Sequence, residues 1–263
     1  MIVWLATSDK VMEPSINSSY DPYQHLPFRA YRSAEWPAGE VCSTLMHFIA
    51  AEKFRGADES YRRFLLSLSD PDDLRLETEA IGQGIGRDDW NNVQFHVVRA
   101  GVWMQLVQHQ ERLREALFQP GFSSGDALLD EAISAIYSRL VAASNPGDEL
   151  RRVILAGDTS LSTDEMFRIF DQLFQNRLPD EIYVSVEDGV AAAAQRYAIS
   201  RYIPVNTFGS VDDVQAAAAA MLEKGTHVFT ISTQEVSDSP LANALLSGAS
   251  AQAKPCHRFS WTA

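Results

Sequence analysis

The sequence has only two cysteines among its 263 residues, and Cys42 and Cys256 belong to no CxxC pair. This scarcity argues against a cysteine metal cage and against a disulfide framework. No apolar run approaches the roughly 20 residues that a membrane span needs, and the opening MIVWLATSDKVM is too short and too polar for a signal peptide. We therefore expect a cytoplasmic protein with no membrane partner, and the sequence indicates no metal and no cofactor.

Basic residues are also few, with 22 Lys and Arg against 35 Asp and Glu and a formal net charge of -13. Binding to DNA or RNA needs clusters of Lys and Arg, and the sequence contains none. We expect no nucleic-acid partner. The acidic surface favours solubility, and mimicry of a nucleic acid toward a basic partner is the alternative.

The first part of the chain combines an irregular opening with several helices. Prolines at positions 14, 22, 27 and 37 exclude long helices there. Short strands are predicted at residues 1–6 and 28–32. Helical spacing of apolar residues, together with turn and capping residues, predicts helices at residues 43–54, 59–68, 91–118 and 126–143.

The pattern of apolar and polar residues changes after NPGD at residues 145–148. Short apolar runs then alternate with helical segments, which predicts βαβ units and a parallel sheet. The expected strands are RVILAG, EIYVSV, IPVNTF and HVFTIS. We expect an α+β chain with a mostly helical domain over residues 1–147 and an α/β Rossmann-like domain over 151–246. The second domain would hold a four-stranded parallel sheet, with residues 247–263 as a tail.

Two blocks in the first domain carry a family resemblance. STLMHFIAAEKF at residues 43–54 resembles the NADAR signature P-T-x-E-H-Y-F-x-A-x-K-F. The segment that begins DDWNNVQF at residue 88 resembles the later D-W-x-x-V stretch of that family. Matching positions are Thr44, His47, Ala51, Lys53, Phe54, Asp89, Trp90, Val93, Val97, Arg99, Gln108 and His109. The resemblance spans about residues 20–120, and it implies hydrolysis of N-glycosidic bonds to ribose, in riboflavin-pathway intermediates or ADP-ribosylated guanine bases.

The resemblance also implies a site, and the sequence departs from it there. The family places Glu, Gln and Lys at i, i+4 and i+7 on the pocket face of the first helix, where this chain has Met46, Ala50 and Lys53. Cleavage of an N-glycosidic bond develops positive charge on the ribose, which a carboxylate must stabilise and which Met46 cannot. The family's W-G-x-G and N-x-L-G block is missing as well.

The implied ligand-binding residues are Met46, His47, Ala50, Lys53 and Trp90. Lys53 is the catalytic candidate if activity survives, through an imine with an opened ribose; otherwise it is a surface or salt-bridging lysine. Trp90 stacks on a base in one interpretation and packs in the core in the other. His47 is more often a packed, hydrogen-bonded histidine than a catalytic one.

A second resemblance covers about residues 150–235. RVILAGDTSLSTDEMFRIFDQLF and AQRYAISRYIPVNTF resemble the SLOG superfamily of Rossmann-like nucleotide-binding domains. The candidate ligand residues are Gly157, Asp158, Thr159, Ser160 and Gly189. Glu187 and Asp188 place negative charge where a phosphate would sit, which favours a ribose or a cation instead. A packing or dimerisation module is the alternative.

Taken together, these features predict a degenerate, NADAR-like pseudoenzyme. We expect it to bind a nucleotide or ADP-ribose-type ligand, or a protein partner, without efficient catalysis. Two alternatives stay open: an active N-glycosidase that uses Lys53, and a structural or assembly protein that reuses both folds. The sequence leaves open whether the chain forms a homo-oligomer.

Overall fold

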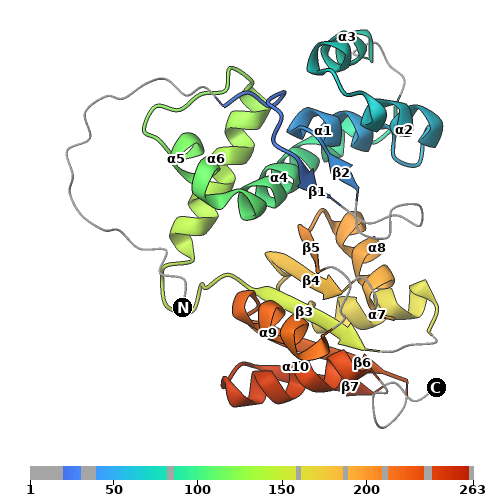
Figure 1. Ribbon diagram of the computed structural model, residues 1–263, viewed down its shortest axis with the longest axis vertical. Coiled ribbons are helices and arrows are strands. Elements are labelled where there is room, and N and C mark those ends of the chain that lie inside the picture. Colours follow the sequence, from blue (N-terminus) through green and yellow to red (C-terminus); the bar gives the residue numbers. More distant parts are fainter. Residues whose placement is uncertain are drawn as a thin grey trace. The chain divides into compact units, whose positions relative to one another are not determined.

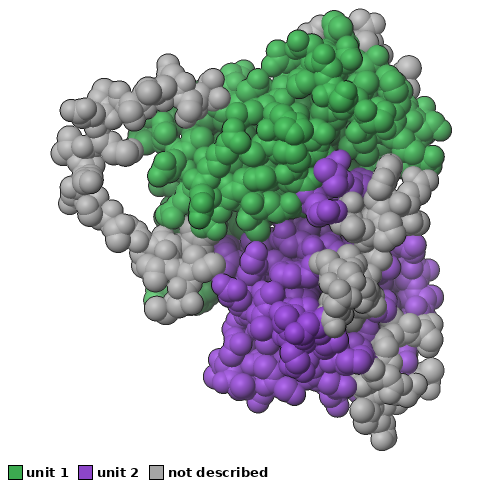
Figure 2. All heavy atoms as spheres, in the orientation of Figure 1, with its two compact units in different colours: residues 1–28, 42–149 green, residues 29–41, 150–263 purple. Residues whose placement is uncertain are grey.

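The computed structural model describes residues 20–30, 40–81, 86–157, 161–185, 189–208, 213–233 and 239–260. The chain divides into two compact units, one of residues 1–28 and 42–149 and one of residues 29–41 and 150–263 (Figure 2). The strand expected at residues 1–6 lies outside the described residues. The strand expected at 28–32 is short: β1 (Phe28–Arg29) pairs with β2 (Val41–Cys42) in a two-stranded sheet.

Unit 1, residues 1–28 and 42–149, is helical in its described part (Figure 1). Its helices are α1 (Leu45–Phe54), α2 (Glu59–Ser67), α3 (Pro71–Ile81), α4 (Trp90–Gln108), α5 (Gln110–Leu117) and α6 (Ala127–Ala142). Side chains cap four of the helix starts, because Thr44, Asp58, Asp70 and Asp126 accept hydrogen bonds from backbone N–H groups of the first turn.

The sequence prediction missed one helix of unit 1 and joined two others into one. The helix expected at 59–68 ends at Ser67, and Pro71 then begins α3 and places Asp72 and Asp73 in its first turn. Proline suits the first helical position, and acidic residues there complement the helix dipole. The single helix expected over 91–118 is divided at His109, whose backbone leaves the helical region at φ -128 and ψ 38.

Helices α1 and α4 pack directly on one another. A Cβ on Gly101 of α4 would lie 2.6 Å from Cδ1 of Phe48 and 2.8 Å from Cδ1 of Leu45. Glycine therefore allows the two backbones to approach closely. A separate core joins α1 to α2 and α3 through Ala50, Phe54, Leu65 and Leu74.

Unit 2, residues 29–41 and 150–263, contains an all-parallel sheet of five strands in the order β5-β4-β3-β6-β7. The strands are β3 (Arg152–Gly157), β4 (Glu181–Ser185), β5 (Val205–Phe208), β6 (His227–Ser232) and β7 (Cys256–Ser260). The helices between them are α7 (Thr163–Leu173), α8 (Ala191–Arg201), α9 (Val214–Lys224) and α10 (Pro240–Ala251). In Figure 1, α9 and α10 cover one face of the sheet, and α7 and α8 cover the other.

The expected count of four strands was wrong, because β7 lies in the segment interpreted as a tail. CHRFS pairs with β6 from Val228↔Cys256 to Ser232↔Ser260. Its side chains are half-buried or exposed, so it lacks the continuous apolar run that marks β3 and β6. The apolar core beneath α9 and α10 includes Ile154, Ala156, Met221 and Leu245.

Candidate functional site

Two of the expected pocket residues, Met46 and Ala50, face a core. Ala50 is buried in the cluster that joins α1 to α2 and α3, and Met46 packs against the same cluster. Met46 also donates its backbone N–H to the carbonyl of Pro22 at 3.1 Å. An apolar residue at each position suits this packing, and a carboxylate at either one would lose hydration there.

His47 is held at both ring nitrogens and is 1 % exposed. Nε2 lies 2.9 Å from the carbonyl oxygen of Leu68, which can only accept, so Nε2 carries the proton. Nδ1 lies 2.8 Å from Oγ1 of Thr44 and accepts from that hydroxyl. Burial lowers the pKa of His47. The ring therefore ties the start of α1 to the end of α2 and offers no nitrogen to a ligand.

Lys53 and Trp90 border the same loop, residues 86–89. Arg87 donates its backbone N–H to the carbonyl of Lys53 at 2.9 Å, and Trp90 donates its own to the carbonyl of Arg87 at 3.1 Å. A Cβ on Gly86 would lie 2.9 Å from Cγ of Lys53, so the loop backbone lies along the lysine stem. Lys53 and Trp90 are each half-buried. Thus the two sequence blocks converge at this loop.

An ion pair shapes the loop. Nε of Arg87 lies 2.5 Å from Oδ1 of Asp89, and Nη2 lies 2.9 Å from Oδ2. The hydrogen bond from Arg87 lowers the pKa of the Asp89 carboxyl. The loop thus brings a guanidinium, a lysine and an indole to the start of α4.

A carboxylate does lie beside Lys53 in sequence, but Arg55 holds it. Glu52 is 2 % exposed and receives Nε of Arg55 at 2.8 Å and 2.9 Å, with Nη2 at 2.5 Å. Both oxygens of Glu52 are engaged by this fork. Glu52 is therefore not available as a substitute for a carboxylate at position 46.

In unit 2, Gly157 ends the central strand β3 in a conformation that only glycine adopts readily, with φ +136. A Cβ there would lie 1.9 Å from the carbonyl oxygen of Ile231 on β6. The residue after Gly189, Val190, donates its N–H to the carbonyl of Gly157 at 3.3 Å. The structure thus brings Gly157 and Gly189 together. Asp158, Thr159, Ser160, Glu187 and Asp188 lie outside the described residues.

This glycine lies where the strand order changes direction. The connections from β3 lead to β4 and β5 on one side, and the chain then returns to β6 and β7 on the other. In open parallel sheets, ligands bind outside the carboxyl ends of the strands at such a switch point. The carboxyl ends of β3 and β6 are therefore the candidate site of unit 2.

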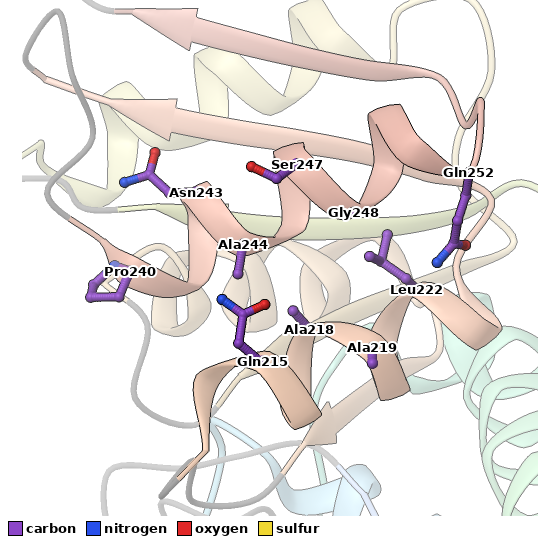
Figure 3. Close-up of a pocket in the computed structure, with 10 residues that line it drawn as sticks. All are labelled: Gln215, Ala218, Ala219, Leu222, Pro240, Asn243, Ala244, Ser247, Gly248 and Gln252. Atoms are coloured by element: carbon purple, nitrogen blue, oxygen red, sulfur yellow. The ribbon is translucent and has the colours of Figure 1, made fainter.

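A pocket of about 350 Å³ between α9 and α10 contains none of the expected residues (Figure 3). Its floor is made of small and apolar side chains, and its rim carries Gln215, Asn243, Ser247 and Gln252. No charged residue lines it, so it offers no cation to pair with a phosphate. A second hollow follows the junction of α4 and α5, from Val107 to Glu115.

Unit 2 also contains a buried polar cluster that the sequence patterns did not predict. Glu181 is 1 % exposed; it accepts from the hydroxyl of Tyr183, and Nδ2 of Asn206 lies 3.4 Å from its Oε2. Nε of Arg152 lies 3.6 Å from Oε1 of Glu181. Burial, followed by the Glu181 charge, raises the pKa of Tyr183. Arg152 and Glu181 begin two expected strands, but only the register places them side by side.

Comparison with protein-family models, with curated proteins and with solved structures finds no match to this chain. Among the described residues, no helix has the length and apolar character to cross a membrane. Within the same residues, no group of three or more His, Cys, Asp or Glu side chains is arranged to hold a metal ion.

Proposed function

We propose that this chain binds a nucleotide or ADP-ribose-type ligand in unit 1, beside Lys53 and Trp90, without efficient catalysis. The observation that supports this proposal is the loop at 86–89, where the Arg87–Lys53 hydrogen bond joins the two NADAR-like blocks. A half-buried indole offers a face for a base, and the lysine offers a charge for a phosphate. The NADAR resemblance is part of this proposal.

The neighbouring side chains support the proposed lack of efficient catalysis. Met46 and Ala50 pack against the α2–α3 core, and Glu52 is held by Arg55. None of these three can stabilise positive charge on a ribose or move a proton. In this proposal Lys53 acts as a charge partner for the ligand rather than as a nucleophile.

Calorimetric titration of the full chain with ADP-ribose tests the proposal. Lys53→Ala should weaken binding by about 1.5–3 kcal/mol, because a hydrogen bond to a charged group is lost. Arg63→Ala is the matched control: Arg63 is an exposed cation on α2 of the same unit, and its loss should leave binding unchanged. Equal losses of affinity in both variants would show that the effect comes from the overall charge of the protein, and would contradict the proposed site.

The switch point of unit 2 is the second candidate, favoured by the strand order and by Gly157. Asp158→Ala separates the two sites. If the ligand binds in unit 1, this variant should bind with unchanged affinity. Weakened binding in Asp158→Ala with unchanged binding in Lys53→Ala would place the ligand in unit 2, and no binding by the wild type would favour the assembly protein.

A further inference from the structure

The amino ends of the unit 2 strands gather two arginine and two histidine side chains from four separate segments. Arg151 precedes β3, Arg177 follows α7, His227 begins β6 and His257 lies in β7. This edge of the sheet is opposite the carboxyl ends at which Gly157 lies, so the cluster belongs to neither candidate site described above.

A chain of contacts runs through the cluster. The guanidinium of Arg151 lies 5.6 Å from the ring centre of Phe174, whose ring meets that of Phe229 edge-on at 6.1 Å. Phe229 stacks on His257 at 5.4 Å with an interplanar angle of 23°. Two phenylalanine rings therefore form an apolar base beneath the cationic groups.

The hydrogen bonds leave the positive charge of this cluster only partly balanced. Arg151 donates Nη1 to the carbonyl of Arg177 at 2.5 Å and Nη2 to that of Leu173 at 3.4 Å, so its guanidinium contacts no carboxylate in the described residues. Asp180 pairs with Nη2 of Arg177 at 3.2 Å and accepts the backbone N–H of Arg151 at 2.9 Å. Asp180 thus pairs with the guanidinium of Arg177 and contacts Arg151 at its backbone N–H.

His227 offers a further donor when its ring is protonated. Its Nδ1 lies 2.9 Å from Oγ1 of Thr226, which fixes the ring. The described residues give its Nε2 no hydrogen-bond partner. Burial lowers the pKa of His227, and the positive charges of Arg151, His257 and Arg177 lower it further. An anion among these groups would oppose the second effect and raise that pKa.

We propose that the cluster of Arg151, Arg177, His227 and His257 binds the phosphate group of a small molecule. Guanidinium and imidazole donors match the acceptor oxygens of a phosphate, and the half-buried setting strengthens charged hydrogen bonds relative to bulk water. The site is separate from the ADP-ribose-type site proposed in unit 1, and neither proposal depends on the other.

Histidine NMR of the full chain, titrated with pH in phosphate and in chloride at equal ionic strength, tests this proposal. The pKa of His227 should be higher in phosphate, while that of His47, which lies in unit 1, should be the same in both salts. An identical curve for His227 in the two salts would overturn the proposal.

Three variants test the site through phosphate affinity. Arg177→Gln should weaken binding about tenfold, since a charged hydrogen bond is lost. Asp180→Asn should strengthen binding, because it removes the opposing charge and keeps an acceptor for the N–H of Arg151. Arg168→Gln removes an exposed cation of α7 and is the matched control, with no change expected. A loss in the control equal to that in Arg177→Gln would refute the proposal.

Three probes distinguish a nucleotide from free phosphate as the ligand: inorganic phosphate, adenosine 5′-monophosphate and adenosine. Tighter binding of the monophosphate than of inorganic phosphate would identify a nucleotide, and equal affinity would identify the phosphate group alone as the ligand. A shift of His227 with adenosine, which carries no phosphate, would contradict the proposal.

Discussion

The carbonyl oxygen of Ile231 occupies the place that a side chain on Gly157 would need, 1.9 Å from an ideal Cβ. The contact joins the ends of β3 and β6, which pair from Val153↔His227 to Gly157↔Ile231. Any side chain at position 157 must therefore displace one of the two central strands.

Gly157→Ala should destabilise unit 2 by about 3–5 kcal/mol, from backbone strain and steric overlap together. Gly121→Ala is the matched control: Gly121 also has positive φ, +76, but nothing lies within 4 Å of its Cβ position. The control should cost about 1 kcal/mol from backbone strain alone. Hydrogen exchange of peptides from β3 and β6 measures the first effect, and similar exchange in the two variants would contradict this account.

His47 should make unit 1 sensitive to acid. Its pKa is below the ordinary 6.5 in the folded chain, so the unfolded chain binds more protons as pH falls past 6.5. The stabilisation is complete above pH 6.5 and is lost as pH falls from there toward the folded pKa. His47→Gln removes the titrating group. Denaturant unfolding at pH 7.5 and pH 5.5 should show a smaller loss for this variant than for the wild type.

The pair of Arg152 and Glu181 should show strong coupling. Glu181→Leu alone should cost about 3 kcal/mol, because the half-buried guanidinium of Arg152 loses its partner. The double variant Arg152→Met and Glu181→Leu should recover most of that loss. A double-mutant cycle measured by hydrogen exchange in β3 and β4 checks this, and additive effects would show that the pair contributes no coupling.

The wild-type chain should not hydrolyse N-glycosidic bonds at ordinary enzyme rates. Turnover of a ribosylated base at about 1 per second or faster would overturn this expectation and favour the active N-glycosidase that uses Lys53. Met46→Glu should not restore activity, because position 46 packs against the α2–α3 core and the last family block is missing. Chromatography that measures release of the free base, with the wild type and Met46→Glu at equal concentration, tests both expectations.

Local patterns predicted the parallel sheet because β3, β4 and β6 are nearly continuous apolar runs between helices. The fifth strand, CHRFS, was not predicted because an edge strand with exposed side chains carries no such run. The division of the long helix at His109 was not predicted for a different reason. Its cause is tertiary, since the ring Nε2 of His109 lies 2.6 Å from the carbonyl of Pro27, far away in sequence.

The sequence predicted which residues share a helix face at the candidate site, but not what packs against them. The spacing of Met46, Ala50 and Lys53 put them on one helix face, but periodicity alone does not say what covers that face. Packing covers Met46 and Ala50, and the loop at 86–89 lies along Lys53. The cationic cluster of unit 2 depends on the register between β6 and β7, which local sequence does not encode.

The strand order has a consequence for synthesis of the chain. β3 can pair with β4 soon after both are made, but its other edge must wait for β6. That strand begins at His227, directly after Thr226, which follows Arg152 by 74 residues. A ribosome adding about 5–20 residues per second needs about 4–15 s to cover that separation. During that interval the apolar edge of Val153–Ala156 is open to pairing with other nascent chains. Aggregation during expression should therefore begin at β3, and slower translation between β4 and β6 should worsen it.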